Sequence, residues 1–245
     1  MSKTIPWSFA LVAAMSFAPA HAATAPSVTL QQCANGSFAT ARACSGAAWT
    51  SGTVNKKNSH YAEDQATPLR ILIGGLTVGS SGNMITFQWD TTEAGVHAYD
   101  YLESFDHTET LSMGDDPCSG VAGCNLGTFT TFPVPVDTLV TDGGVTPRAG
   151  IFVLFGGTIT GVSAYQYVGT YTGRSSAAIS ITFTANTPNP VLAMGGHLAS
   201  ASDWGSAGSG ASSVSGTLQA RLYSFNGKNK SQTQSLSGVA LIPGP

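Results

Sequence analysis

Hydrophobic positions along this chain alternate with polar positions in several short segments. In 85–89 every second residue is apolar, and 179–183 and 218–222 repeat this pattern. A period of two places the apolar side chains on one face of a half-buried strand. The run 151–155, Ile-Phe-Val-Leu-Phe, is apolar on both faces and predicts a central strand. Further candidate strands are 27–32, 70–76, 165–171 and 190–195.

Segments rich in glycine, serine or proline separate these runs. They include 78–82, 142–144 and 186–190, whose residues are typical of turns. Many short strands with such connections predict an all-β protein, an antiparallel β-sandwich with long Gly/Ser-rich loops and little helix. The segment 96–109 combines acids at a spacing of three with alternating aromatics. It predicts a strand that runs into a short helix or turn near Ser104.

The first 22 residues have the pattern of a secretory signal peptide. Lys3 is followed by an apolar run over 7–17, and 20–22 is a small-x-small cleavage site. No later segment reaches the roughly 18 consecutive apolar residues that a membrane-spanning helix needs. The sequence therefore predicts a secreted protein, extracellular, periplasmic or at the cell surface, with no integral membrane span. The remaining 245 − 22 = 223 residues suit one β-sandwich domain, 23–245, with a flexible loop at about 205–213.

The four cysteines are compatible with export to an oxidising compartment. Four cysteines allow three pairings, which the sequence leaves open. Short loops close at low entropic cost, so we expect the local pairs Cys33–Cys44 and Cys118–Cys124. Each would contribute roughly 2–3 kcal/mol by restricting the unfolded chain. A zinc site is disfavoured because no C-x2-C spacing occurs.

Acidic residues are concentrated in one part of the chain, which we call the acidic region (63–116). Ten of the thirteen acids lie there with a single basic residue, Arg70, which gives a local net charge of 1 − 10 = −9. Loss of Lys3 with the signal peptide leaves 10 − 1 = 9 bases against thirteen acids, a net charge of −4. This balance excludes nucleic acid and anionic lipid as partners, because both need a basic face.

So many carboxylates repel one another unless they are spread apart, protonated or bridged by a cation. Calcium is the cation that clustered carboxylate oxygens most often bind, so we expect Ca²⁺ as the cofactor of this region. The candidate metal ligands are Glu63, Asp64, Asp90, Asp100 and Asp106.

Three histidines are candidates for a site with these acids. His60 and His97 lie beside or within the acidic region, and His197 could be brought to it by the fold. His60 lies in a polar loop, and His97 follows Asp90 across a turn. His197 follows two glycines, which let the backbone approach closely or turn sharply, and Asp203 lies six residues later. An imidazole beside a carboxylate can bind a metal or act as a base. One hypothesis is therefore a metal-assisted hydrolase that uses these three histidines and Asp203. The other interpretation is structural: a polar loop, a tied hairpin and a buried histidine satisfied by a neighbouring carboxylate.

Nucleophilic catalysis finds little support in the sequence. Neither G-x-S-x-G nor H-E-x-x-H occurs, and oxidised cysteines cannot act as thiolates. Trp49 and Trp204 are candidates for stacking on sugar rings, which would make the protein a carbohydrate-binding module. Trp89 alternates with Phe87 and is expected in the core.

Several segments resemble exported bacterial proteins of cell-surface contexts that have no settled biochemical role. The motifs are Asn58-Ser-His-Tyr-Ala-Glu63, Pro68-Leu-Arg70, Trp89-Asp90, His97-Ala-Tyr-Asp-Tyr-Leu102, Asp116-Pro-Cys118, Phe132-Pro-Val-Pro135, Val191-Leu-Ala-Met-Gly-Gly-His197 and Asp203-Trp204. Together they extend over most of the mature chain. Related surface proteins contain prealbumin-like or immunoglobulin-like sandwiches, so the resemblance implies a fold of that kind.

The leading hypothesis from the sequence is a secreted, non-catalytic structural or binding module at the bacterial cell surface or in the extracellular matrix, stabilised by calcium. Its expected partner is an extracellular protein or glycan. The hydrolase and the carbohydrate-binding module are the alternatives. The oligomeric state is not determined by the sequence.

Overall fold

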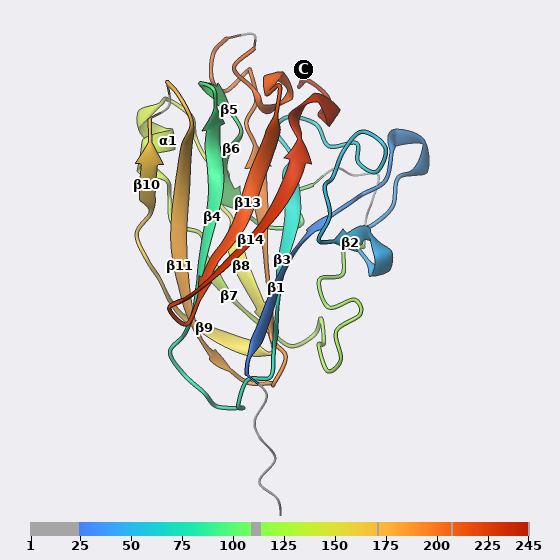
Figure 1. The fold of residues 1–245 in the computed structure, drawn as a ribbon, viewed down its shortest axis with the longest axis vertical. Helices are drawn as coiled ribbons and strands as arrows, with labels where there is room; N and C mark the ends of the chain where they lie inside the picture. The colour runs from blue at the N-terminus through green and yellow to red at the C-terminus, as the bar shows by residue number, and fades with distance from the viewer. Residues whose placement is uncertain (1–24, 109–113, 171, 207, 245) are drawn as a thin grey trace, which may run out of the picture.

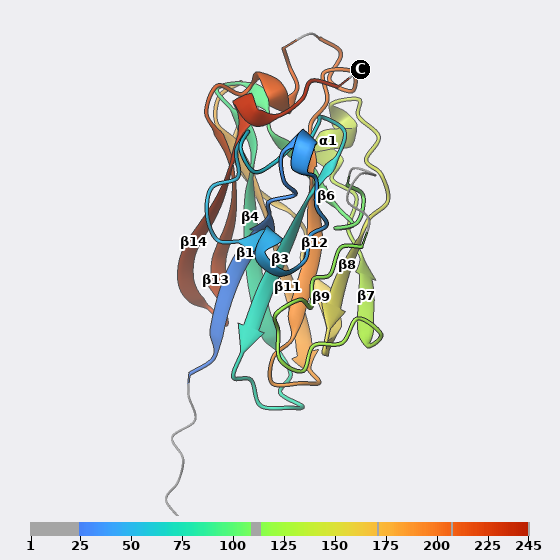
Figure 2. The same cartoon turned by 90° about the vertical axis from the view of Figure 1, so that its right-hand side faces the viewer.

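The computed structural model describes residues 25–108, 114–170, 172–206 and 208–244 as two antiparallel β-sheets packed face to face (Figures 1 and 2). The first sheet has the order β2 (Trp49–Thr50), β1 (Ser27–Cys33), β3 (Ala66–Gly74), β12 (Val191–Leu198), β8 (Ile151–Phe155) and β7 (Phe129–Pro133), with β6 (Tyr99–Glu103) paired to β12. The second has the order β10 (Gln166–Gly169), β11 (Ser175–Ala185), β4 (Asn83–Glu93), β13 (Thr217–Phe225) and β14 (Lys228–Ser237). In that sheet β5 (Val96–His97) also pairs with β4, and β9 (Gly157–Val162) with β11.

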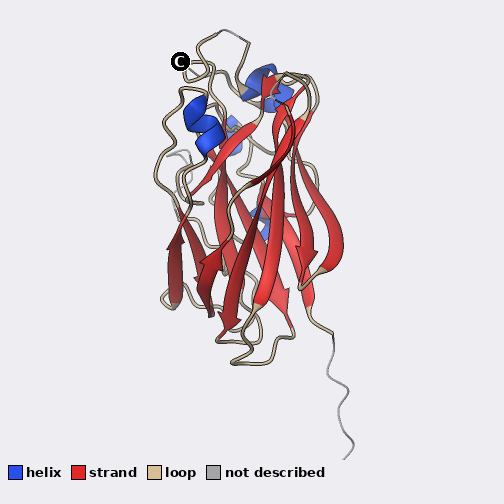
Figure 3. Ribbon diagram, turned by 90° about the vertical axis from the view of Figure 1, so that its left-hand side faces the viewer, coloured by secondary structure: helices blue, strands red, loops and turns tan. Residues whose placement is uncertain are grey.

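Helical structure is sparse in the described residues (Figure 3). It consists of one short α-helix, α1 (Thr138–Asp142), and the 3-10 turns Phe38–Thr40, Gly46–Ala48, Ala211–Ser213 and Gly238–Ala240. The predicted all-β antiparallel sandwich with little helix is confirmed, and each segment expected to be a strand overlaps one. The segment after residue 96 forms β5 and β6 and then turns just beyond Ser104, also as predicted. The expected signal peptide, 1–22, lies outside the described residues.

The core follows from the alternation seen in the sequence. In β4 the side chains of Ile85, Phe87 and Trp89 are buried while the residues between them are partly exposed, and β11 and β13 alternate in the same way. These faces form one hydrophobic cluster with residues of the other sheet, such as Leu30 and Ile71. Each fully buried large apolar side chain stabilises the fold by about 1.5–3 kcal/mol.

The strand β8 is interior but not central, because it lies between β12 and the edge strand β7. It is apolar on both faces because Val153 and Phe155 pack on the outer side of the sheet in a cluster with Cys118. The neighbouring strand β12 is buried along its whole length. The loop that carries the second disulfide therefore covers this sheet and makes its middle a three-layered structure.

Both expected disulfides are present. Cys33–Cys44 and Cys118–Cys124 have Cα–Cα distances of 5.5 and 5.2 Å, and the local pairing is confirmed. Arg70 of β3 holds the second disulfide loop, since its Nη1 donates to the carbonyl oxygens of Pro117 (2.8 Å) and Ser119 (2.7 Å). Burial lowers the pKa of Arg70 to about 10 despite the nearby Asp116. The single base inside the acidic region thus supports a loop rather than a ligand.

Glutamine side chains close one side of the sandwich between β1 and β14. Gln232 accepts from the Leu30 amide (2.9 Å) and donates to the Val28 carbonyl oxygen (2.8 Å), and Gln234 donates to the Leu30 carbonyl oxygen (2.9 Å). An edge strand otherwise presents unpaired backbone groups to other chains. Next to the short pairing of β1 with β2, these side chains bond the backbone of β1 at Val28 and Leu30.

The end of the segment expected to be a flexible loop, 205–213, packs on the sandwich. Gly210 and Ala211 are buried, and Ser212 donates two hydrogen bonds to Glu63. Among the described residues no helix is long and apolar enough to cross a membrane.

Candidate functional site

A group of charged side chains built around a buried ion pair lies where β3, β6 and β12 meet, toward the end of the sandwich that carries the chain's C-terminus (Figure 2). His197 is the last but one residue of β12, and a register shift in the β12–β6 pairing falls between Gly196 and Leu198. Such a bulge re-aims the side chain that it contains. The two preceding glycines allow close packing: an added Cβ at Gly195 would lie 2.5 Å from the Ser104 carbonyl oxygen. This is the close backbone approach that the sequence suggested.

Asp100 of β6 is the inner partner of His197. Its Oδ1 accepts from His197 Nδ1 (2.6 Å) and from the Tyr101 amide (3.0 Å), and its Oδ2 accepts from Trp204 Nε1 (3.1 Å). Both side chains of the pair are fully buried. The Tyr101 ring stacks on the imidazole at a centroid distance of 4.1 Å. The buried carboxylate therefore has a full set of donors.

The outer nitrogen of His197 faces a second carboxylate. Nε2 lies 3.3 Å from Asp64 Oδ1, and the Asp64 side chain is 58% exposed. Asp64 also pairs with Arg148 (3.2 Å), which in turn lies 3.4 Å from Glu103 Oε2. We call the set Asp64, Asp100, Glu103, His107, Arg148 and His197 the Asp100–His197 network; His107 joins through Glu103 Oε2 at 2.7 Å.

His197 is held as a cation. Each of its ring nitrogens faces a carboxylate oxygen, which only accepts hydrogen bonds, so both nitrogens must carry a proton. Burial by itself disfavours the imidazolium, but Asp100 and Asp64 outweigh it and raise the pKa of His197 to about 9. For Glu103 burial dominates and raises the pKa of its carboxyl group despite His107 and Arg148.

His97 connects to this network through Trp204. The two rings stack at a centroid distance of 3.5 Å and an interplanar angle of 10°, and the same indole donates to Asp100. Burial lowers the pKa of His97, which favours the neutral imidazole. The expected pairing of His97 with Asp90 across the hairpin is wrong. β5 places His97 opposite Thr92, while the Asp90 carboxylate accepts from Arg221 Nη1 (2.7 Å) on β13.

His60 belongs to a different part of the molecule. Its Nδ1 lies 2.7 Å from the Gly36 carbonyl oxygen, and its ring meets Phe38 edge-on. It lines a surface hollow of about 470 Å³ with the segment around Val239. The structure therefore brings His97 and His197 to one network through Trp204, and it places His60 in another cluster.

The other predicted metal ligands also have separate roles. Glu63 accepts from the amides of Ala201 (3.1 Å), Ser212 (3.0 Å) and Gly244 (3.3 Å), so it ties three loop segments together. These hydrogen bonds outweigh burial and lower the pKa of Glu63. Asp106 is exposed.

Asp203 is exposed as well, and its amide donates to Ser200 Oγ. The carboxylates that contact His197 are Asp100 and Asp64, and Asp203 is not among them.

No group of three or more His, Cys, Asp or Glu side chains with the geometry of a metal site occurs in the described part of the chain. The three-histidine centre that the hydrolase hypothesis required is therefore not formed there. Of the five carboxylates proposed as calcium ligands, only Asp64 and Asp100 belong to one cluster, where His197 lies between them. Glu63, Asp64, Asp90 and Asp100 are engaged by protein groups.

Neither tryptophan proposed as a sugar platform is freely presented. Trp49 is buried, donates from Nε1 to the Asp116 carbonyl oxygen (2.9 Å) and lies under the Arg70 guanidinium. Trp204 is partly buried between His97 and Asp100. Trp89 lies in the core, as predicted.

Sequence reasoning did not identify the cations that balance the acidic region. Arg148 pairs with Asp64 and Glu103, Arg174 with Glu93 (2.5 Å), and Arg221 with Asp90. All three arginines come from the half of the chain after the acidic region. The available signal was the small number of basic residues. Because the acidic region contains a single base, any other cation that pairs with its acids has to come from a distant part of the sequence.

Searches with this chain against protein-family models, curated proteins and solved structures found no match.

Proposed function

We propose that this protein is an exported, disulfide-stabilised β-sandwich that acts as a non-catalytic structural or binding module at the bacterial cell surface or in the extracellular matrix. The observation that carries the proposal is the state of His197. This histidine is a buried cation between Asp100 and Asp64, with both ring nitrogens engaged. The two ion pairs of His197 hold β12, β6 and the loop of Asp64 together. They leave neither ring nitrogen for a substrate.

The protonation of His197 argues against a role as a general base. A general base has to be unprotonated near the working pH, and its pKa is best matched to that pH. The neighbouring carboxylates raise the pKa of His197 to about 9, so at neutral pH the imidazole has no lone pair to offer. The Asp100–His197 network is, on this view, an ionic support for the loops at this end of the sandwich.

Export is supported by two further features. The two disulfides fit an oxidising compartment, and the first 22 residues have the composition of a signal peptide. The two-sheet architecture is compatible with the immunoglobulin-like or prealbumin-like surface modules that the sequence resembles. A low charge content and the covered edge of β1 suit a protein that remains folded outside the cell.

The proposal is tested by locating the full chain in the cells that encode it and by measuring its binding. We expect the protein in the exported fraction with no free thiols. Purified protein should also bind saturably to the surface of cells that lack its gene. A reduced cytoplasmic protein, or exported protein without saturable binding to cells or matrix, would overturn it.

A hydrolase screen separates the catalytic alternative. Ester, glycoside and phosphodiester substrates are tested with and without Zn²⁺, using the wild type and His97→Gln, which removes a predicted catalytic imidazole outside the buried ion pair. Turnover that the variant abolishes while it remains folded would contradict the non-catalytic assignment. We expect no turnover in either protein.

A further inference from the structure

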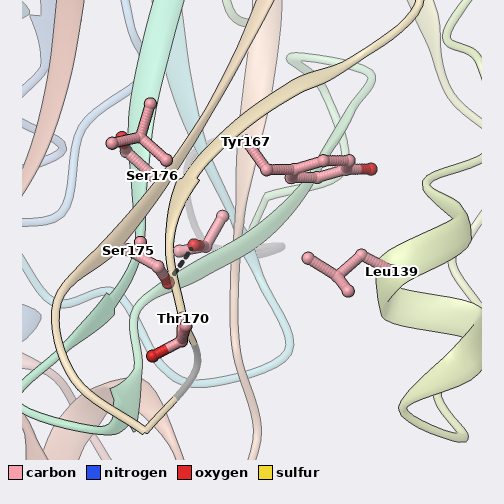
Figure 4. Close-up of a pocket in the computed structure, with 8 residues that line it drawn as sticks. Leu139, Tyr167, Thr170, Ser175 and Ser176 are labelled. Carbon is pink, nitrogen blue, oxygen red and sulfur yellow. Dashed lines mark hydrogen bonds between the residues drawn. The ribbon is translucent and has the colours of Figure 1, made fainter.

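A pocket of about 280 Å³, whose lining includes no member of the Asp100–His197 network, lies between the edge strand β10, the start of β11 and the helix α1. It is lined by Thr91, Leu139, Tyr167, Val168, Gly169, Thr170, Ser175 and Ser176. In Figure 4 the Tyr167 ring extends toward α1 and Leu139 extends from α1 toward the strand. Segments distant in the sequence thus build its two walls.

The aromatic wall of this pocket is fixed in place. The Tyr167 hydroxyl donates to Asp137 Oδ1 (2.5 Å), the carboxylate oxygen that also caps α1 by accepting from the Leu139 amide (3.0 Å). Burial and the neighbouring carboxylate raise the pKa of Tyr167, so the phenol remains protonated and the bond is kept. Because one carboxylate anchors both walls, the Tyr167 ring and Leu139 keep a set spacing. The residue Tyr167 is 38% exposed.

The opposite wall carries a chain of hydrogen-bonded hydroxyl groups, and the donor of each hydrogen bond in it can be assigned. Thr92 Oγ1 donates to the Gly173 carbonyl oxygen (2.8 Å), so the contact between Thr92 and Ser175 (2.6 Å) must use the Ser175 proton. The contact between Ser175 and Thr91 (2.6 Å) then uses the Thr91 proton. Thr91, which is itself buried at 1% exposure, therefore has no hydroxyl proton left to donate, and any further bond at its Oγ1 must use the lone pairs.

A donor lies beside this acceptor. Ser176 Oγ accepts from Gln88 Nε2 (3.1 Å), which leaves the Ser176 proton for a ligand oxygen. A register shift in the β11–β4 pairing falls between Ser175 and Ser176, and both residues line the pocket although they are neighbours in a strand. The pocket thus combines one directed acceptor, one donor and an aromatic face.

These features select the chemistry of the ligand. The eight lining residues carry no formal charge, so a neutral ligand fits better than an ion. A pyranose ring has an apolar C–H face that packs on an aromatic ring and hydroxyls that both donate and accept. The volume lies just below the roughly 300–1,000 Å³ of sites for drug-sized ligands, which suits one ring of a longer chain. Val168, 65% exposed at the sheet edge, leaves room for the chain to continue outside.

The geometry points to this pocket as a subsite for one neutral sugar residue of an extracellular glycan. This inference rests on the proposed function and names the ligand class of the binding module. The sequence also suggested a carbohydrate ligand, with Trp49 and Trp204 as the stacking residues. The pocket instead assigns the stacking role to Tyr167.

The test begins with a panel of neutral oligosaccharides built from hexoses and N-acetylhexosamines, with uronic-acid oligosaccharides as the anionic comparison. The dissociation constant of the best ligand is then measured for the wild type, Tyr167→Ala, Tyr167→Phe and Ser176→Ala. Two variants serve as controls. Tyr223→Ala removes an exposed tyrosine of β13, and Ser180→Ala removes a serine of β11 that lies outside the pocket and contacts Thr86 of β4. Thermal melts of every variant establish that it is folded.

We expect Tyr167→Ala to weaken neutral-sugar binding by tenfold or more and Ser176→Ala by several-fold. Tyr167→Phe keeps the ring and should retain most of the affinity, while both controls stay within twofold of the wild type. Sugar binding that the pocket variants leave unchanged would overturn the inference while supporting the binding module. Binding of no glycan, or of anionic glycans only, would also overturn it, and the cell-binding assay would then decide the proposed function separately.

Discussion

Burying the ion pair of His197 and Asp100 carries a large desolvation penalty. Two charges lose their hydration, and the attraction between them compensates for this only with good geometry and further hydrogen bonds. Here Asp100 gains the Trp204 indole and the Tyr101 amide, and His197 gains Asp64. Removing one partner of such a pair leaves the other charge buried without compensation.

We therefore expect His197→Gln to lower the free energy of unfolding by about 3–5 kcal/mol, because it leaves Asp100 buried without its cation. The matched control is His107→Gln, which alters the same network at a side chain that is 37% exposed and should cost less than about 1 kcal/mol. Urea or guanidinium denaturation of both variants measures the difference. Equal costs would show that burial of the pair is not what matters.

The titration of His197 gives the stability a defined dependence on pH. Its pKa is about 9 in the folded protein against a usual value of 6.5, so the folded state binds the proton more tightly than the unfolded chain. Its contribution is complete below about pH 6.5 and is lost as the pH rises through about 9.

Wild-type stability should fall between pH 7 and 9.5, and the fall should be much smaller in His197→Gln. Denaturant melts at half-unit pH steps give both curves. Parallel curves for the two proteins would assign the effect to other groups.

At the scale of elements, β14 is joined to the sandwich in an unusual way. One side pairs with β13, and the side chains of Gln232 and Gln234 reach the backbone of β1 in the other sheet. The same elements are side by side in Figure 1. The exposed edge that β1 would otherwise present is thereby closed.

Gln232→Ala should expose this edge, because it removes the partners of the Leu30 amide and the Val28 carbonyl oxygen. We expect a loss of about 1–3 kcal/mol in unfolding free energy and faster hydrogen exchange at the Leu30 amide. Gln166→Ala, on the exposed strand β10, is the control and should change neither quantity. Unchanged exchange at Leu30 in Gln232→Ala would refute the role assigned to this side chain.

At the scale of the whole molecule, the fold distributes the charge of the acidic region. Asp90 and Glu93 lie on the second sheet with arginines from later strands and loops, and Asp64, Asp100 and Glu103 gather at the first sheet with Arg148 and His197. Repulsion is thus relieved by separation and by internal cations. An added metal ion is not needed for this purpose.

Calcium should accordingly leave the melting temperature unchanged. A calcium site in the folded protein would raise the free energy of unfolding by about 2.7 kcal/mol when the calcium concentration is about a hundred times the dissociation constant. A thermal melt detects a change of that size. The comparison is between melts in millimolar CaCl₂ and in EDTA, with MgCl₂ as the control for ionic strength and divalent charge. A rise of several degrees specific to calcium would restore the sequence-based expectation of a calcium site.

Much of the fold was predictable because strand formation leaves a local trace. Residues two apart share a face, so the segments 85–89, 179–183 and 218–222 revealed half-buried strands. The strand β14 escaped prediction because Gln232 and Gln234 turn inward to a backbone about 200 residues away, and no apolar alternation marks them. Loop closure favoured the local disulfide pairs, which the structure contains.

The candidate site was predictable only in its components. The glycines before His197 indicated a close backbone approach, and the acidic region indicated charge that had to be balanced. The pairing of His197 with Asp100, 97 residues earlier, and of Asp64 with Arg148 was not, since partner choice depends on sheet order and register. By itself the sequence determined where the strands with apolar alternation lie and where charge accumulates, because both depend on near neighbours along the chain. Tertiary structure alone decided which charges meet, because only the packing of β3, β6 and β12 brings distant side chains within hydrogen-bonding distance.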